Sequence, residues 1–241
     1  RWLGFRSWFR SWFRSWTGSV ADKGIERMHF IDLSKMISPQ IAVYPGDAKV
    51  HFETEATFDE QGYCLTRMHL STHTGTHIDA PRHFLGDGCG VTEMALEAFV
   101  GPAVLLDLKP LMLKNGQEIT PRTLEPYQDV FQRGARVIIN TGWTEVCPPE
   151  EARHFTDHPV FTPQAIHWIA DRRPLLVGMD LPSPHSQQQR ATHEPLLRAG
   201  IVLLEGLLNL SSLPREFTLI ALPLALENLD GSPVRAVAMI P

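Results

Sequence analysis

The chain has 241 residues, of which 43% are hydrophobic and 20% charged, so it can bury a sizeable core and disorder throughout is excluded. Its 27 acidic and 22 basic residues give a formal net charge of −5, and nucleic-acid binding is not expected because it requires a basic face. No apolar run reaches the roughly 18 residues that a membrane-spanning helix needs, so no membrane partner is expected either.

The first residues differ in composition from all that follows. Residues 5–16 repeat Phe-Arg-Ser-Trp three times, and the first 20 residues hold four arginines and no acidic residue. We interpret residues 1–27 as a leader-like or tag-like segment outside the fold, with Met28 as the expected native start. The alternative is a basic, aromatic segment that binds an anionic membrane surface.

From residue 28 onward no linker or low-complexity tract interrupts the chain, which predicts a single domain over 28–241. Threonine followed by proline at 120–121 and 162–163 marks two helix starts, with ends expected near 132 and 172. A third helix is expected over 193–199. Short apolar and β-branched runs predict strands near 29–33, 48–55, 63–70, 102–108, 135–141, 175–180, 201–205, 216–224 and 233–240. The order of these elements indicates an α/β fold with a mixed sheet.

Candidate metal ligands are concentrated in residues 71–84, Ser-Thr-His-Thr-Gly-Thr-His-Ile-Asp-Ala-Pro-Arg-His-Phe. His73, His77, Asp79 and His83 offer the imidazole and carboxylate groups that bind zinc, manganese or iron. A helix would direct Asp79 away from the two preceding histidines, whereas an extended chain places all four on one side. A straight strand would separate His73 from His83 by about 33 Å, so the segment must curl, with Gly75 the expected bend. A polar turn with incidental histidines is the alternative.

This string resembles the signature of the cyclase family of metal-dependent hydrolases, which includes bacterial kynurenine formamidases (arylformamidases) and isatin hydrolases. Further resemblances follow in order along the chain. They are Val43-Tyr44-Pro45-Gly46-Asp47, residues 138–143 ending in Thr-Gly-Trp, His193 with Glu205-Gly206-Leu207, residues 221–224, and residues 231–236. The resemblance implies a swivelling-type α/β fold with a mixed sheet and flanking helices, and a homodimer or homotetramer.

The resemblance also implies a site. His73, His77 and Asp79 would hold a first divalent ion, and Asp79 would bridge to a second one completed by His193 and Glu205. Zinc is the expected ion, manganese the alternative, and one or two ions are compatible with the sequence. From the residues alone, His193 could simply begin a helix and Glu205 could cap a turn.

The resemblance implies that His83 is the catalytic acid/base. An imidazole with a pKa near neutrality can take a proton from water and return it to a leaving nitrogen. It could instead be a fourth ligand or a structural histidine. Tyr44 stands where kynurenine formamidases carry a substrate-contacting tryptophan, and Trp143 is a second candidate for substrate binding. Either side chain could equally be a packing residue. His154 and His158 lie in a polar stretch and are expected to be solvated.

The resulting hypothesis is a metal-dependent amidohydrolase that opens a carbon–nitrogen amide bond of a small aromatic substrate, similar to arylformamidases of tryptophan catabolism. Residues 181–190 lack the Ser-x-Asp-Pro-x-x-Ser-Lys string of kynurenine formamidases, which leaves isatin hydrolase or another cyclic amide or lactone hydrolase as alternatives. A non-catalytic metal-binding or ligand-binding protein is the alternative from another class. The three unpatterned cysteines, Cys64, Cys89 and Cys147, indicate a reducing, cytoplasmic location.

Overall fold

The computed structural model describes residues 28–241, and the fold lies in one compact unit, Phe30–Ile240. The Phe-Arg-Ser-Trp repeat, and with it the prediction about residues 1–27, lies outside the described residues. The strands are β1 (His29–Asp32), β2 (His51–Ala56), β3 (Leu65–His69), β4 (His77–Asp79), β5 (Val100–Asp107), β6 (Glu118–Ile119), β7 (Arg136–Asn140), β8 (Val160–Phe161), β9 (Leu176–Met179), β10 (Val202–Glu205), β11 (Glu216–Ile220), β12 (Gly231–Pro233) and β13 (Val237–Ile240). The α-helices are α2 (Phe58–Gln61), α3 (Pro121–Leu124), α4 (Trp143–Val146), α5 (Pro163–Arg172) and α6 (Gln189–Arg198), and several connections contain short 3₁₀ turns.

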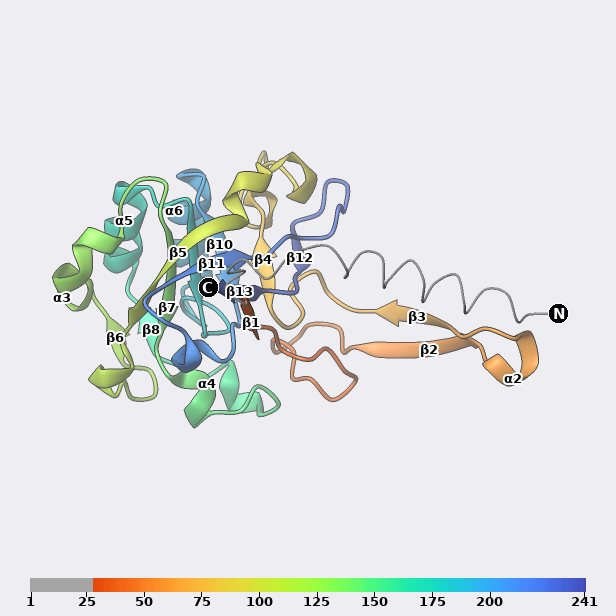
Figure 1. The fold of residues 1–241 in the computed structure, drawn as a ribbon. Helices are drawn as coiled ribbons and strands as arrows, with labels where there is room; N and C mark the ends of the chain where they lie inside the picture. Colours follow the sequence, from red (N-terminus) through yellow and green to blue (C-terminus); the bar gives the residue numbers. More distant parts are fainter. Residues whose placement is uncertain (1–27) are drawn as a thin grey trace, which may run out of the picture. The chain divides into compact units, whose positions relative to one another are not determined.

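A nine-stranded mixed sheet forms the centre of the unit, in the order β1-β13-β11-β5-β7-β9-β10-β4-β12 (Figure 1). Strands β5, β7, β9 and β10 run parallel, and antiparallel strands extend the sheet on both sides. The parallel strands β7, β9 and β10 are buried along their whole length, as expected for apolar strands covered on both faces. The predicted α/β fold with a mixed sheet and flanking helices is confirmed.

Neighbouring residues of the central strands enter two different hydrophobic clusters, because successive side chains of a strand point to opposite faces. Ile138 and Leu204 belong to one cluster, and Ile139 and Leu203 belong to the other. The second cluster also contains buried side chains of α5 and α6, so these two helices cover that face of the sheet. The end of β10 therefore lies close to α6, and this proximity matters for the site described below.

Two of the three predicted helices differ from their expected bounds. Helix α5 begins and ends as predicted, and Thr162 Oγ1 accepts the Ala165 N–H at 3.2 Å. The helix expected to reach residue 132 stops being α-helical after Leu124 and continues as a 3₁₀ turn, because Pro126 cannot donate the next hydrogen bond. Helix α6 begins at Gln189, so His193 lies inside the helix and not at its first turn.

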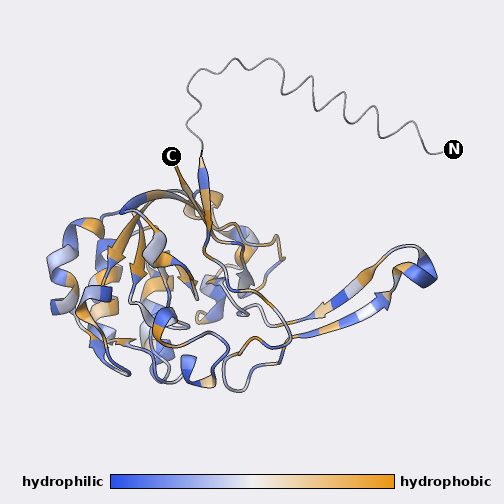
Figure 2. Cartoon of the chain, turned by 60° about the horizontal axis from the view of Figure 1, so that its bottom comes forward, coloured by the Kyte–Doolittle hydropathy of each residue, from blue (hydrophilic) through white to orange (hydrophobic). Residues whose placement is uncertain are grey.

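Strands β2 and β3 form a separate two-stranded antiparallel sheet, closed at its tip by α2. Figure 2 shows this hairpin extending away from the large sheet, with hydrophobic and hydrophilic residues interspersed. Its exposed apolar side chains are Phe58, Tyr63, Leu65 and Met68. The hairpin thus presents apolar surface that its own unit does not cover.

Among the described residues, every helix is too short or too polar to cross a bilayer.

Candidate metal centre and its pocket

Strand β4 carries two of the predicted ligands. His77 and Asp79 are two residues apart in this extended segment, so their side chains leave on the same side. Gly75 has a φ of +73°, a left-handed conformation that glycine adopts without steric cost, and the chain turns there between His73 and His77. The predicted bend at Gly75 is confirmed.

The pairing of β4 with β10 brings Glu205 to this side of the sheet. In their antiparallel register Glu205 lies directly opposite His77, although the two residues are far apart in sequence. Helix α6 supplies His193, whose Nε2 lies 3.3 Å from Glu205 Oε1 and 3.7 Å from Asp79 Oδ2. His77 Nε2 lies 3.3 Å from Glu205 Oε2 and 3.4 Å from Asp79 Oδ1. Four predicted ligands therefore converge, and all four are buried.

Two of the histidines are oriented by backbone carbonyls. His77 Nδ1 donates to the carbonyl of Gly75 at 3.1 Å, and His193 Nδ1 donates to the carbonyl of Gln189 at 2.7 Å. Because a carbonyl only accepts, the proton is on Nδ1, and each Nε2 is turned toward the carboxylates with its lone pair free when the ring is neutral. Metal-bound histidines are commonly held in this way by their second nitrogen.

Two buried carboxylate oxygens indicate that the four converging side chains suit a cation. Asp79 Oδ2 and Glu205 Oε1 accept no hydrogen bond, which is costly for buried carboxylates in a protein interior. Donor atoms of His77, Asp79 and Glu205 lie within 4.8 Å of one another, as do those of His73, Asp79 and His83. Asp79 belongs to both groups. The residues fit a divalent cation chemically, with Asp79 placed between two candidate positions.

The charges of the cluster support the same interpretation. Burial would raise the pKa of Asp79, but hydrogen bonds from His73 and His77 outweigh it and hold that pKa well below its usual value. Burial opposes the charged form of His77, yet its contacts with Asp79 and Glu205 raise its pKa to about 9. The ionised carboxylates thus attract protons onto the imidazoles. A divalent cation would supply the same positive charge and displace those protons.

His73 and His83 form a neighbouring pair. Their rings are stacked with centroids 3.9 Å apart. His73 places Nδ1 at 2.9 Å from Asp79 and Nε2 at 2.9 Å from Asp230, and these bonds outweigh burial and raise its pKa to about 10. In contrast, burial lowers the pKa of His83, with Asp79 acting in the opposite direction. His83 is therefore the neutral histidine of the pair, and its donor atom lies within 4.8 Å of donor atoms of His73 and Asp79.

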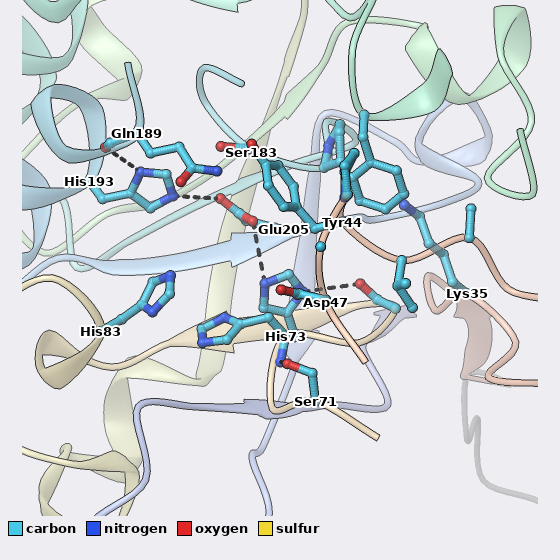
Figure 3. Close-up of a pocket in the computed structure, with 18 of the residues that line it drawn as sticks. Lys35, Tyr44, Asp47, Ser71, His73, His83, Ser183, Gln189, His193 and Glu205 are labelled. Atoms are coloured by element: carbon cyan, nitrogen blue, oxygen red, sulfur yellow. Dashed lines mark hydrogen bonds and ion pairs between the residues drawn. The ribbon is translucent and has the colours of Figure 1, made fainter. Parts of the chain in front are cut away.

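The cluster borders a cavity of about 550 Å³ (Figure 3), which is lined by His73, His77, His83, His193, Glu205 and Asp230. His83 and His193 lie on one side of the view, Lys35 lies on the other, and Glu205 lies between them. Tyr44 and Phe155 add aromatic surface, with their rings edge to face at 6.0 Å. The cavity can therefore hold a small aromatic molecule against the candidate metal centre.

The two predicted substrate contacts occupy different places. Tyr44 lines the cavity, and its hydroxyl donates to the carbonyl of Ser186 at 3.0 Å. Trp143 is buried outside the cavity lining, where its indole N–H donates to the carbonyl of His154 at 3.1 Å.

The expectation that His154 and His158 are solvated is wrong, since both are fully buried. Their stretch folds inward because His154 packs against Trp143 and bonds to the backbone of Cys147.

Two charged lining residues escaped the sequence analysis: Lys35 and Asp230. Asp230 immediately precedes β12, whose register with β4 sets Gly231 opposite Asp79. The family resemblance at residues 231–236 begins directly after Asp230, and it was the one feature of the sequence that could have drawn attention to this residue. Lys35 follows β1 as a single basic residue in a mostly apolar stretch, and no local pattern distinguishes it from a surface lysine.

Comparisons with known proteins agree with this geometry. The Cyclase family model, described as "Putative cyclase", matches residues 31–186. The chain is 38% identical over 215 residues to a kynurenine formamidase of Salinibacter ruber, covering 87% of this chain and 97% of that protein. It is similar to isatin hydrolase A from Labrenzia aggregata, with a TM-score of 0.78, 27% identity, and coverage of 97% and 99%. The structure of a predicted metal-dependent hydrolase from Bacillus stearothermophilus matches with a TM-score of 0.72, 28% identity, and coverage of 88% and 98%.

Proposed function

The chain belongs to the cyclase family, and on that premise we propose that it is an arylformamidase-like, metal-dependent hydrolase that cleaves the formamide C–N bond of a small aromatic substrate. The family relationship and the amide-hydrolysing activities of its relatives support this reaction class.

One observation carries the proposal: His77, Asp79, His193 and Glu205 converge at 3.3–3.7 Å, and three of them, His77, His193 and Glu205, line a cavity that His83 also lines. We assign His73, His77, Asp79, His193 and Glu205 as metal ligands, with Asp79 bridging two ions. The carboxylate oxygens without hydrogen-bond donors support this assignment. Histidine and carboxylate donors suit zinc, and manganese accepts the same set.

When bound, the divalent cation supplies Lewis-acid chemistry, since it polarises a carbonyl and lowers the pKa of water. Water adds to the formyl carbon, the C–N bond breaks, and the products are formate and the aryl amine. His83 takes the proton from the attacking water and delivers it to the departing nitrogen. Its lowered pKa keeps the ring neutral near pH 7, as the first of these transfers requires.

The test is hydrolysis of a substrate panel by zinc-loaded protein: N-formylkynurenine, formanilide, isatin and a simple lactone. We expect the formamides to be cleaved, chelation to abolish the activity, and zinc or manganese to restore it. Full activity in a sample shown metal-free by elemental analysis would contradict the proposal, as would turnover of the lactone alone.

Isatin hydrolysis is the second candidate. The similarity to isatin hydrolase A favours it, and so does the departure of residues 181–190 from the kynurenine formamidase pattern. This departure lies at the pocket, because Pro182, Ser183 and Gln189 line the cavity. A non-catalytic binding protein is less well supported, since ligand binding alone does not require His83 beside the metal centre.

The apolar side chains on the β2–β3 hairpin support a homodimer or homotetramer, because exposed apolar surface of this kind commonly marks a protein interface. Sedimentation or light scattering on the protein would measure its oligomeric state. We also propose a cytoplasmic location, which is supported by three cysteines that are all free.

A further inference from the structure

Lys35 is a buried lysine whose side chain faces the cavity. It is only 8% exposed, and it is the one lysine or arginine among the described residues that line the cavity. Its backbone N–H donates to Thr76 Oγ1 at 2.8 Å, and that hydroxyl donates to the carbonyl of Gly206 at 2.7 Å. Thr76 and Gly206 adjoin the proposed ligands His77 and Glu205. The backbone of Lys35 is thus attached to the two segments that present the metal ligands.

The ammonium group of Lys35 is held by a neutral partner. Nζ lies 2.8 Å from His154 Nε2. His154 Nδ1 lies 3.1 Å from the carbonyl of Cys147, which requires the proton on Nδ1 and leaves Nε2 to accept from the lysine. Burial, and then the charge of Lys35, lower the pKa of His154 to about 3, so this imidazole stays neutral. Trp143 stacks on the ring and fixes the carbonyl of His154.

Lys35 therefore lacks the ionic partner that a buried charge normally has. Among the described residues, no carboxylate oxygen lies within 4.0 Å of Nζ. Burial lowers the pKa of Lys35 to about 8, and the more distant Glu205 and Asp180 act in the opposite direction. The amine is still mainly protonated at pH 7, with donors to spare after its bond to His154.

We infer that Lys35 is a specificity-determining residue that binds a carboxylate of the substrate, so that the preferred substrates are N-formyl aryl amines bearing a carboxylate. The inference rests on the proposed function, because it concerns the same cavity and the same reaction. A substrate carboxylate would provide the ionic partner that the protein itself does not place beside Nζ. The ammonium–carboxylate contact is a charge-assisted hydrogen bond, among the stronger polar interactions in a site of low dielectric constant.

The position of Lys35 relative to the metal centre agrees with this role. Figure 3 places Lys35 across the cavity from His83, with Tyr44 and Glu205 between them. A Cβ atom added to Gly206 would lie 3.1 Å from Nζ, so the ammonium is beside the residue that follows the ligand Glu205. An aromatic ring lying between these groups can place its formamide at the centre and its carboxylate at the lysine.

The experiment compares substrates that differ only in the carboxylate: formanilide and the 2-, 3- and 4-formamidobenzoates. Zinc-loaded wild type is measured beside Lys35→Met, which keeps the length of the side chain and removes its charge, and Lys35→Arg, which retains the charge. Lys114→Met is the matched control, because Lys114 is exposed and does not line the cavity. Zinc content and thermal unfolding are determined for every variant.

We expect wild type to prefer at least one formamidobenzoate over formanilide in kcat/KM. Lys35→Met should reduce kcat/KM for that substrate by about 10- to 100-fold, mainly through KM, and change formanilide by less than about twofold. Lys35→Arg should recover part of the preference, and Lys114→Met should behave as wild type. Equal losses for both kinds of substrate would indicate a structural role and overturn the inference, as would an unchanged preference in Lys35→Met.

A binding measurement separates this inference from the proposed reaction. Calorimetry with benzoate and benzamide on the zinc-loaded protein should show benzoate binding weakened by about tenfold or more in Lys35→Met, with benzamide unaffected. If wild type cleaves no formamide but benzoate binding depends on Lys35, the reaction is wrong and the carboxylate site stands. If formamides are cleaved but benzoate binding is unchanged, the inference is wrong. Lys35→Gln, which can still donate to His154, replaces Lys35→Met should that variant unfold.

Discussion

Two walls of the cavity bury charge in opposite ways. The carboxylate wall, defined as His77, His193 and Glu205 with Asp79 directly behind them, holds two ionised carboxylates, each with one oxygen that accepts no hydrogen bond. The lysine wall, defined as Lys35 with His154 and Trp143 packed behind it outside the cavity lining, holds one ammonium whose direct side-chain partner is a neutral imidazole. Both walls are attached to the Gly75–Thr76 turn and to the end of β10.

The difference indicates what each wall is suited to bind. Isolated buried charges are costly, so each wall gains most from a ligand of the opposite sign. The carboxylate wall suits a divalent cation, and the lysine wall suits an anion. Their arrangement on two sides of one cavity would orient a molecule that carries a reacting carbonyl at one end and a carboxylate at the other.

The strongest test of the carboxylate wall is Asp79→Asn. If Asp79 bridges two ions, this variant should lower zinc affinity by more than about 100-fold, because even residues that only support ligands cost 10- to 100-fold, and hydrolysis should be lost with the metal. Ions per chain are counted by elemental analysis beside His73→Ala, which should lose less. Asp47→Asn is the control, since Asp47 lines the cavity without contacting the cluster. Equal metal content in Asp79→Asn and wild type would refute the bridge.

A variant of His83, which lies beside the carboxylate wall, distinguishes a role in proton transfer from a role in metal binding. His83→Ala should keep its metal and its fold while kcat falls by roughly 10²–10⁴-fold, the usual contribution of a positioned acid/base. Because the pKa of His83 is lowered, the ring is neutral at pH 7, and wild-type kcat should decline only as the pH falls through that pKa. The variant should lack this decline. If it instead loses as much metal as His73→Ala, His83 is a ligand.

Trp143→Phe tests whether Trp143 serves only to pack the lysine wall and makes no contact with the substrate. The carbonyl of His154 would lose its donor, so the free energy of unfolding should fall by about 1–3 kcal/mol, while zinc content and KM stay within about twofold of wild type. Denaturant unfolding and steady-state kinetics give the two values. A large rise in KM at unchanged stability would show that Trp143 contacts the substrate after all.

The smallest effect on stability is expected at Tyr44, which lines the cavity beside Phe155. Tyr44→Phe removes the bond to the carbonyl of Ser186 but keeps the ring and its contact with Phe155. Unfolding free energy should fall by about 0.5–1.5 kcal/mol, and KM should rise less than tenfold. Tyr44→Ala is the comparison, because it also removes the aromatic surface. If both variants keep the wild-type KM, Tyr44 only packs the turn.

Local sequence was sufficient for the features that depend on neighbouring residues. The spacing of His77 and Asp79 requires one side of an extended chain, and Gly75 permits the turn that admits His73. The paired threonine and proline before α5 predicted its start, because capping acts within one helical turn. The same signal failed to predict the length of α3, since Pro126 ends the α-helical hydrogen bonds.

Tertiary structure decided the rest. His193 and Glu205 were candidates only through a family resemblance, because the β4–β10 register and the packing of α6 bring them to His77 and Asp79. The contact between Lys35 and His154 was invisible in the sequence, since the two residues are 119 residues apart and each resembles a surface residue. Hydrophobic periodicity encodes which faces are buried, but strand register and helix packing determine which distant charges share a cavity. The charge pattern of this pocket is therefore a property of the folded chain.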